Sequence, residues 1–294
     1  MKSTPHLYNP AKTLNIQGTL VDLSTPRIMG ILNVTPDSFY DGDRYTSEDS
    51  IIRQTEKMLS EGATFVDIGG YSSRPGAEDI SEKEEITRTV GAVKLIAKKF
   101  PAAVLSVDTF RSEVARQAIL EGASIINDIS AGEQDQQMFA TVAKLNVPYI
   151  VMHMRGTPQT MKTLTEYENL IKEISAFLQQ KIDLLESIGV KDVMIDPGFG
   201  FAKTADQNFL LLEHLDYLKI LGKPIVAGVS RKSMIWKTLE IKPEDALNGT
   251  TALNMTAIMK GASILRAHDV KEAFEVVKLY ERLNSHRSPF TSNW

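Results

Sequence analysis

The sequence predicts an α/β fold, a (β/α)8 TIM barrel formed by a single domain. Short apolar runs alternate with longer stretches in which apolar side chains recur at helical spacing, and this alternation repeats eight times. Parallel strands bury both faces and need helical crossovers, so the alternation indicates a parallel sheet. Eight strands close a barrel, and 294 residues are enough for one. An open doubly wound sheet is the structural alternative.

Each expected element follows from local composition. The strands are runs rich in Val, Ile, Leu and Met at residues 27–35, 64–70, 103–108, 124–129, 149–154, 193–196, 224–227 and 263–266. Helical patterns lie at 46–60, from the capping box Ser81–Glu84, at 114–119, 134–145, 170–185, 207–221, in a broken segment that ends at 260, and at 270–280. We expect residues 1–26 to be a lead-in with a short strand pair near 14–20, residues 27–285 to form the barrel, and residues 286–294 to be a C-terminal tail.

Composition excludes several classes of function. Hydrophobic residues make up 43% and charged residues 24% of the chain, as in ordinary globular proteins. The 33 Lys and Arg against 37 Asp and Glu give a net charge of −4, so we expect no nucleic-acid partner. The absence of cysteine excludes disulfides, thiolate zinc sites and a cysteine nucleophile. With no signal-peptide pattern and no apolar run of the ~18 residues that span a membrane, we expect a cytoplasmic protein without a membrane partner.

Polar side chains gather where the expected strands end. A lone Asp or Asn there is typical of a helix cap or a turn, but here eight strand ends in register each offer a polar or charged group. In a barrel these ends meet on one face, where the loops build the ligand site. The cluster therefore predicts a binding site, and its members are Asn33, Asp67, Asp108, Asn127, Asp128, His153, Asp196, Lys232, Arg266 and His268.

The side-chain types in this cluster limit the ligand. Asp108 and Asp196, with Asp128 as a third candidate, accept hydrogen bonds. Lys232 follows a buried strand and donates them, whereas its neighbour Arg231 is expected to form a structural salt bridge. This mixture suits a planar ring with alternating donors and acceptors.

An anion site is expected beside the ring site. Arg266 and His268 precede the last expected helix, whose free amides favour a phosphate group. Two long loops, 36–43 and 71–77, carry aromatic, acidic and basic side chains and are expected to close over the site. The sequence therefore predicts a phosphorylated substrate.

Nine stretches, most of them at strand ends, form recognisable motifs in a fixed order. They are Ile31–Phe39, Asp67–Gly70, Ser73–Ala77, Ser106–Thr109, Ile126–Asp128, Met152–Met154, Asp196–Phe201, Ser230–Lys232 and Arg266–His268. Together they closely resemble the dihydropteroate synthase family from about residue 27 to 285. One departure is Tyr71, where many members carry Glu, which puts details of the second loop in doubt.

The resemblance implies a reaction and a set of roles. The reaction joins p-aminobenzoate to 6-hydroxymethyl-7,8-dihydropterin diphosphate and gives 7,8-dihydropteroate and pyrophosphate. The resemblance also implies a Mg²⁺ cofactor and a homodimer. By resemblance, the pterin contacts are Asp108, Asn127, Asp196 and Lys232, with Arg266 packed on the ring. The diphosphate contacts are Asn33, Arg74, Arg266 and His268, with Asn33 on the metal, and the p-aminobenzoate contacts are Phe39, Ser73, Pro75, Lys232 and Ser233.

The implied chemistry is a dissociative displacement, in which the bond to the diphosphate breaks before the amine attacks. Asp108 and Asp41 would stabilise the resulting cation, and Lys232 would lie between the two substrates. Two alternatives stay open. A barrel aldolase would use Lys232 in a Schiff base. A non-catalytic pterin-binding barrel, or a corrinoid-linked methyltransferase relative, would bind the ring without this reaction.

Overall fold

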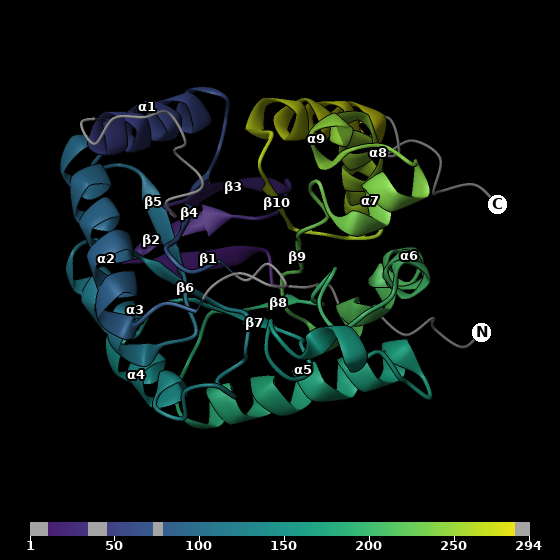
Figure 1. Cartoon of the computed structure of the whole chain (residues 1–294), viewed down its shortest axis with the longest axis horizontal. Coiled ribbons are helices and arrows are strands. Elements are labelled where there is room, and N and C mark those ends of the chain that lie inside the picture. Colours follow the sequence, from purple (N-terminus) through teal and green to yellow (C-terminus); the bar gives the residue numbers. More distant parts are fainter. Residues whose placement is uncertain (1–10, 35–45, 73–78, 286–294) are drawn as a thin grey trace.

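The computed structural model describes residues 11–34, 46–72 and 79–285, which form a barrel of parallel strands ringed by helices (Figure 1). The barrel strands are β3 (Arg27–Asn33), β4 (Phe65–Gly69), β5 (Val104–Asp108), β6 (Ile125–Asp128), β7 (Tyr149–Met152), β8 (Val193–Asp196), β9 (Val226–Ala227) and β10 (Ile264–Ala267). Neighbours follow the chain from β3 to β8, and β10 lies between β3 and β9.

The barrel closes at a seam between β8 and β9. There the strands share one bridge, Ile195 to Ile225, and the Ile195 amide donates to the Pro224 carbonyl at 2.9 Å. The last barrel strand, β10, pairs with the first, β3, and the seam joins the two remaining edges, β8 and β9. The predicted barrel is therefore confirmed. The alternative of an open doubly wound sheet is wrong.

Helices follow the strands, as the apolar periodicity predicts. They are α1 (Thr46–Ser60), α2 (Glu82–Lys99), α3 (Ser112–Leu120), α4 (Met138–Leu145), α5 (Leu170–Ser187), α6 (Ala205–Glu213), α7 (Ser233–Thr238), α8 (Leu247–Met259) and α9 (Val270–Asn284). Short 3-10 turns are η2 (Met161–Thr163), η3 (Leu215–Leu221) and η4 (Pro243–Asp245). The expected break in the seventh helical segment falls at η4, where Pro243 cannot donate a helical hydrogen bond.

Two helix boundaries differ from the expected ones. The fourth helix begins at Met138 rather than 134, because the Asp135 carboxylate accepts the amides of Ser112 and Gln137 and holds a turn there. The expected helix at 207–221 is α6 followed by η3. It starts earlier because Thr204 caps it in a reciprocal capping box with Gln207.

An N-terminal hairpin, β1 (Thr13–Ile16) and β2 (Thr19–Asp22), fills the amino-terminal end of the barrel. Leu14, Ile16 and Leu23 pack there against inward-facing strand residues such as Met29 and Phe65. Inward residues near this end are apolar, whereas those near the carboxyl ends of the strands are polar. The barrel is therefore closed by apolar packing at its amino-terminal end and presents polar side chains at its carboxyl-terminal end, where barrels bind ligands.

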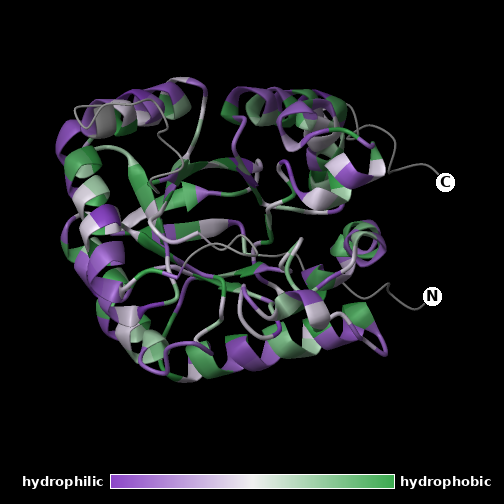
Figure 2. Ribbon diagram, in the orientation of Figure 1, coloured by the Kyte–Doolittle hydropathy of each residue, from purple (hydrophilic) through white to green (hydrophobic). Residues whose placement is uncertain are grey.

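The colouring of Figure 2 shows how hydropathy follows this arrangement. Strands are largely hydrophobic, while the outer helices alternate hydrophobic and hydrophilic stretches. Such amphipathic helices bury one face on the barrel and leave the other in water. Among the helices that the structure describes, none has the length and apolar character needed to cross a membrane.

Replacing Leu14 by Ala tests the hairpin as a plug. The side chain is only 1% exposed and packs in the barrel end, so we expect the free energy of unfolding in urea to fall by about 2–4 kcal/mol. The matched control is Leu20→Ala in the same hairpin, where the side chain is 68% exposed and the loss should be small. Equal losses in the two variants would show that Leu14 does not seal the core.

Candidate active site

Strand alternation delivers the polar side chains to the mouth of the barrel. Successive residues on a strand face opposite sides, so every second residue points into the barrel. Strand register then sets neighbours, because Asp108 pairs with Gly69 on β4 and with Asn127 on β6. Near the carboxyl ends, this geometry places one polar group from each of several strands around one opening.

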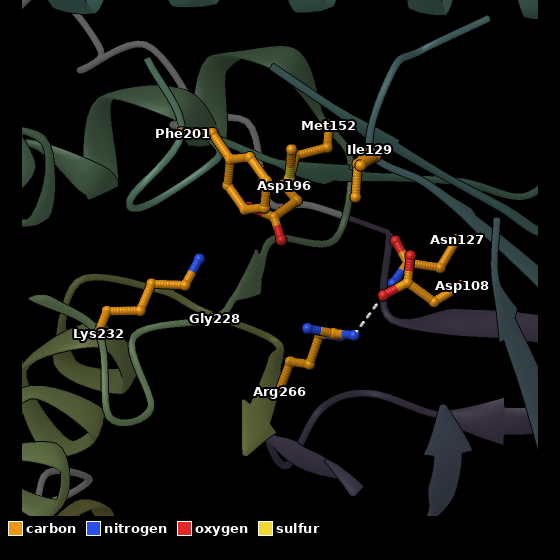
Figure 3. A pocket seen from close by; sticks show the side chains of 9 residues that line it. All are labelled: Asp108, Asn127, Ile129, Met152, Asp196, Phe201, Gly228, Lys232 and Arg266. Atoms are coloured by element: carbon orange, nitrogen blue, oxygen red, sulfur yellow. Dashed lines mark hydrogen bonds and ion pairs between the residues drawn. The ribbon is translucent and has the colours of Figure 1, made fainter. Parts of the chain in front are cut away.

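A pocket at this mouth contains the five residues expected at a pterin. Figure 3 shows Lys232 and Arg266 entering from one side, with Asp108 and Asn127 facing them from the other. Its lining consists of Asp108, Asn127, Ile129, Met152, Asp196, Phe201, Gly228, Lys232 and Arg266. Carboxylates, an amide and two cations thus surround a space that is capped by apolar side chains.

Arg266 lies at the centre of the polar network. Its Nε donates to Asp67 Oδ2 at 2.6 Å, and its second terminal nitrogen donates to Asp108 Oδ2 at 2.6 Å. Asn127 Nδ2 also donates to Asp67 Oδ2, at 3.0 Å. These carboxylates raise the pKa of Arg266 above its ordinary value, although burial opposes the rise. Asp67, which is fully buried, therefore orients both Arg266 and Asn127.

The two pocket carboxylates are held in a poorly solvated place. Burial raises the pKa of Asp108 to about 7, Arg266 opposes the rise, and the Asp67 carboxylate adds to it. Burial also raises the pKa of Asp196, against the nearby Lys232 charge and a 2.7 Å hydrogen bond from the Gly198 amide. A ligand with N–H groups would add donors to those that Arg266 gives Asp108 and the Gly198 amide gives Asp196.

Lys232 closes the opposite side of the pocket. Its Nζ donates to the Phe199 carbonyl and lies 4.7 Å from the centre of the Phe201 ring. Burial lowers the pKa of Lys232 to about 8, although the Asp196 carboxylate raises it. Ser233, the expected p-aminobenzoate contact, follows directly as the first residue of α7.

The expected anion corner lies beside the pocket at the start of α9. Ser230 Oγ is 3.0 Å from His268 Nδ1 and accepts the His268 amide at 3.2 Å. His268 therefore sits against the loop that carries Lys232. Arg231 faces away from the pocket, where its Nε and a terminal nitrogen bind both oxygens of Asp269 at 2.9 and 2.7 Å. Its expected role as a structural salt bridge is confirmed.

Two of the strand-end groups point away from the mouth. Asp128, the third candidate carboxylate, follows the inward-facing Asn127 and so faces outward, where Tyr149 Oη donates to it at 2.6 Å. It organises the next loop by accepting the amides of Ser130 and Gly132. His153 is buried with its ring edge-on to Phe177, 5.0 Å between centroids. Neither is part of the pocket.

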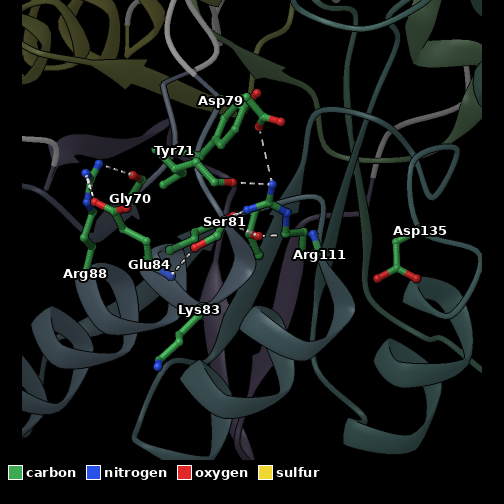
Figure 4. Close-up of polar contacts among 12 residues, drawn as sticks. Gly70, Tyr71, Asp79, Ser81, Lys83, Glu84, Arg88, Arg111 and Asp135 are labelled. Carbon is green, nitrogen blue, oxygen red and sulfur yellow. Dashed lines mark hydrogen bonds and ion pairs between the residues drawn. The ribbon is translucent and has the colours of Figure 1, made fainter.

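The flanks of the second loop are tied to the strand that carries Asp108. Figure 4 shows Arg111 reaching the end of that loop, where it donates to the Ile80 carbonyl at 2.8 Å and lies 3.5 Å from Asp79. Arg111 also binds the buried Glu85 at 2.7 Å and lies 5.5 Å from the centre of the Tyr71 ring. At Tyr71, the departure from the family pattern, a ring thus packs against a cation.

Some predicted contacts fall in parts of the chain that the structure leaves out. Phe39, Asp41, Ser73, Arg74 and Pro75 lie outside the described residues. Their proposed contacts with p-aminobenzoate, the diphosphate and the developing cation have no counterpart in the described geometry.

Three apolar residues of the pocket have no role assigned from the sequence. They are Ile129, Met152 and Phe201. Met152 and Phe201 fall within the recognised motifs, whereas Ile129 lies outside them. Asp67 belongs to the expected strand-end cluster, but the sequence assigns it no role. It lies two residues before Gly69 on β4, so its side chain is on the same, inward face of the strand. Strand alternation is the signal that finds Asp67, while the apolar lining depends on the folded loops.

Asn33 fits the expected magnesium ion. Among the described residues there is no cluster of three or more His, Cys, Asp or Glu side chains that could hold a metal. A Cβ on Gly69 would lie 3.8 Å from Asn33 Oδ1 and 3.6 Å from Asp108 Cβ, so the Asn33 amide oxygen faces the mouth. A single oxygen donor suits Mg²⁺, which keeps water and phosphate oxygens as its remaining ligands.

Comparison with known families agrees with this site. The family model described as "Pterin binding enzyme" matches residues 29–268, which is most of the chain. The chain therefore belongs to the pterin-binding enzyme family, and the polar pocket lies within the matched region.

Relatives of the chain include dihydropteroate synthases. The enzyme of that name from Synechocystis sp. is 46% identical over 228 residues, covering 76% of this chain and 78% of that protein. The structure of Yersinia pestis dihydropteroate synthase in a sulfonamide complex superposes with a TM-score of 0.87 at 40% identity, covering 93% and 99% of the two chains. The Xanthomonas albilineans enzyme in complex with 7,8-dihydropteroate superposes with a TM-score of 0.84 at 35% identity, with the same coverage.

The raised pKa of Asp108 predicts a pH dependence of stability. Folding raises this pKa from 3.8 to about 7, so between these values the folded state binds more protons than the unfolded state. Stability must then fall as the pH rises through that window. We expect the free energy of unfolding of the wild type, relative to Asp108→Asn, to fall from pH 4 to pH 7 and to level off above.

Urea denaturation at each pH gives this difference. The exposed Asp216 on η3 supplies a matched Asp216→Asn control. A difference that rises with pH in this range would mean that Arg266 outweighs burial and that Asp108 stays ionised.

Proposed function

We propose that the chain joins p-aminobenzoate to 6-hydroxymethyl-7,8-dihydropterin diphosphate, forming 7,8-dihydropteroate and releasing pyrophosphate. One observation carries the proposal. Asp108, Asn127, Asp196, Lys232 and Arg266 converge on one pocket from separate strands and loops. Relatives that share this fold bind a sulfonamide or 7,8-dihydropteroate, which supports a pterin and an aminobenzoate at the same mouth.

The pterin is proposed to lie across the pocket. Its ring N–H groups would donate to Asp108 and Asp196, two carboxylates of the pocket whose pKa burial raises and which can accept further hydrogen bonds. Asn127 can both donate and accept at the same edge. Lys232 would donate to a ring acceptor, and Arg266 would pack on the ring while bound to its carboxylates.

The remaining substrate groups are proposed to extend out of the pocket. Asn33 and His268 lie at strand ends that border the mouth, and with Arg74 and Arg266 they would face the diphosphate. Ser233 at the start of α7 would hold the aminobenzoate carboxylate beside Lys232, with Phe39, Ser73 and Pro75 framing the ring. When bound, a magnesium ion on Asn33 would supply positive charge to the diphosphate.

The proposed displacement is dissociative. The C–O bond to the diphosphate breaks first, and its electron pair leaves with the pyrophosphate. Asp108 and Asp41 would stabilise the positive charge that develops on the exocyclic methylene. The aniline nitrogen then attacks this carbon and loses a proton. Exclusion of water from the pocket protects the cation until the amine reaches it.

The same proposal covers the organisation of the protein. Residues 27–285 would form the catalytic barrel, preceded by the lead-in of residues 1–26 and followed by the tail of residues 286–294. We place the enzyme in the cytoplasm as a homodimer. Exposed apolar side chains on η3, at the C-cap of α7 and at the end of α8, namely Tyr217, Ile220, Leu239 and Met259, are available for a dimer surface. Sedimentation equilibrium should give twice the chain mass, and a monomer mass would refute the dimer.

Pyrophosphate release is the direct test of the reaction. Mixing the pterin diphosphate, p-aminobenzoate and Mg²⁺ with the protein should release one pyrophosphate for each 7,8-dihydropteroate formed. Chelating the metal should suppress release, because the diphosphate charge is then less neutralised. Pterin binding without any pyrophosphate would favour the non-catalytic pterin-binding barrel.

Asp108→Asn separates binding from catalysis. If Asp108 stabilises the cation, the variant should lose about 100-fold or more in turnover but less than about tenfold in pterin affinity. Initial rates and calorimetric titration with a pterin give the two quantities, and Asp216→Asn serves as the exposed control. Equal losses would show that Asp108 only binds the ring.

A Schiff-base aldolase remains testable, because the lowered pKa of Lys232 is what such chemistry requires. Family membership argues against it. Borohydride trapping with candidate aldehydes should leave Lys232 unmodified. A covalent adduct at Lys232 in the peptide map would sink the proposed transferase reaction.

A further inference from the structure

One wall of the pocket is a loop rather than a strand or helix. Residues 197–204 connect β8 to α6, and two of their groups face Lys232, the Phe199 carbonyl and the Phe201 ring. Phe201 is also part of the pocket lining. The shape of this loop therefore sets both the pocket wall and the position of the Lys232 ammonium.

The loop backbone turns sharply three times. Gly198, Gly200 and Ala202 have φ values of +74°, +80° and +48°. A Cβ on Gly198 would lie 2.0 Å from the His153 carbonyl oxygen, so the loop presses directly on the end of β7. Such a path interrupts the repeating hydrogen bonds of regular structure, so the loop carbonyls depend on local and side-chain donors.

Lys203 adds a side-chain donor to two of the loop carbonyls, one of which, the Gly198 carbonyl, also accepts the Phe201 amide at 3.1 Å. Its Nζ donates to the Gly198 carbonyl at 2.9 Å and to the Phe201 carbonyl at 3.0 Å, and it lies 3.1 Å from His153 Nδ1. An ammonium has three N–H donors, and three acceptors converge on it here. Burial lowers the pKa of His153 to about 2, so its ring is neutral and Nδ1 can accept.

Lys203 is itself buried and does not line the pocket. Burial lowers its pKa to about 7, and the Asp196 carboxylate counters that fall. A buried lysine in a small loop is expensive unless its charge is compensated. Here the carbonyl oxygens of the loop stabilise the Lys203 charge, and Lys203 in turn holds those carbonyls in place. The position of Lys203 and the shape of the pocket wall therefore depend on each other.

We propose that Lys203 is a positioning residue for the pterin pocket, acting through the loop that holds Phe199 and Phe201 against Lys232. The proposal rests on the proposed pterin site but adds a residue that touches neither substrate. Tyr167 and Asn208 brace the same loop from outside, by hydrogen bonds to the Ala202 carbonyl at 2.9 Å and from the Gly200 amide at 2.7 Å. Neither of these reaches the carbonyls that Lys203 holds.

Lys203→Met is the direct test, because it keeps an unbranched apolar chain that is one atom shorter and removes the three donors. We expect the dissociation constant of pterin-6-carboxylate, measured by calorimetry, to rise about tenfold or more as the loop carbonyls lose the Lys203 donor. Lys162→Met, at an exposed position on η2, is the matched control and should bind as the wild type does. Tyr167→Phe removes an outer brace and should change affinity far less.

A milder variant and a rescue keep a folding role distinct from a positioning role. His153→Phe retains a ring against Phe177 and removes one acceptor, so we expect a rise of about threefold in the dissociation constant. Because the chain has no cysteine, Lys203→Cys offers a single thiol. Alkylation with 2-bromoethylamine in denaturant, followed by refolding, rebuilds the lysine length and should restore pterin binding, with wild type treated alike as control.

The outcomes are distinguishable. Unchanged pterin affinity in Lys203→Met would overturn the inference, as would an unfolded Lys203→Met combined with unchanged affinity in His153→Phe. If the wild type itself fails to bind the pterin, the proposed function is wrong. The crystal structure of Lys203→Met then decides the inference, since an unmoved Phe199–Phe201 backbone would refute it.

Discussion

The mouth of the barrel depends on the pairing of Arg266 with Asp67 and Asp108. A single charge in a barrel interior would lose its hydration and gain no interaction that offsets the loss. Here each of the three groups compensates another, at 2.6 Å on both sides of the guanidinium. Removing one partner of such a buried set typically costs about 3–5 kcal/mol, because it strands the others. The network therefore fixes the positions of Arg266 and Asp108 before any ligand arrives.

This pairing is possible because the inward-facing side chains change from apolar to polar along the barrel axis. Met29 and Phe65 point inward near the amino ends of their strands, in an apolar layer that the hairpin covers. Two residues further along β4 the same face presents Asp67. The apolar layer holds the strands rigidly together, so the polar layer above it gains fixed geometry without supplying the cohesion of the fold.

Strand positions and the polar residues that line the pocket were predictable because both depend on local signals, an apolar run and the polar residue that ends it. Asp128 shows the limit of that signal. It ends a strand as Asp108 does, but its position one residue after Asn127 turns it outward. Phe201 and Lys203 were beyond reach, because their roles arise only where a loop folds back on itself. Two helix starts were missed because side chains decide them: Asp135 holds a turn before α4, and Thr204 caps α6.

The seam between β8 and β9 has the sparsest backbone pairing in the barrel. One bridge joins these strands, whereas the N-terminal segment contacts both sides of the seam at the amino-terminal end of the barrel. The Asn15 amide binds Asp192 just before β8 at 3.1 Å, and the Ala11 amide binds Gly222, four residues before β9, also at 3.1 Å. The N-terminal segment therefore joins both sides of the seam at the amino-terminal end of the barrel. Gly228, Lys232 and Asp196 line the pocket at the other end, so the sparsest strand pairing in the barrel borders the pocket.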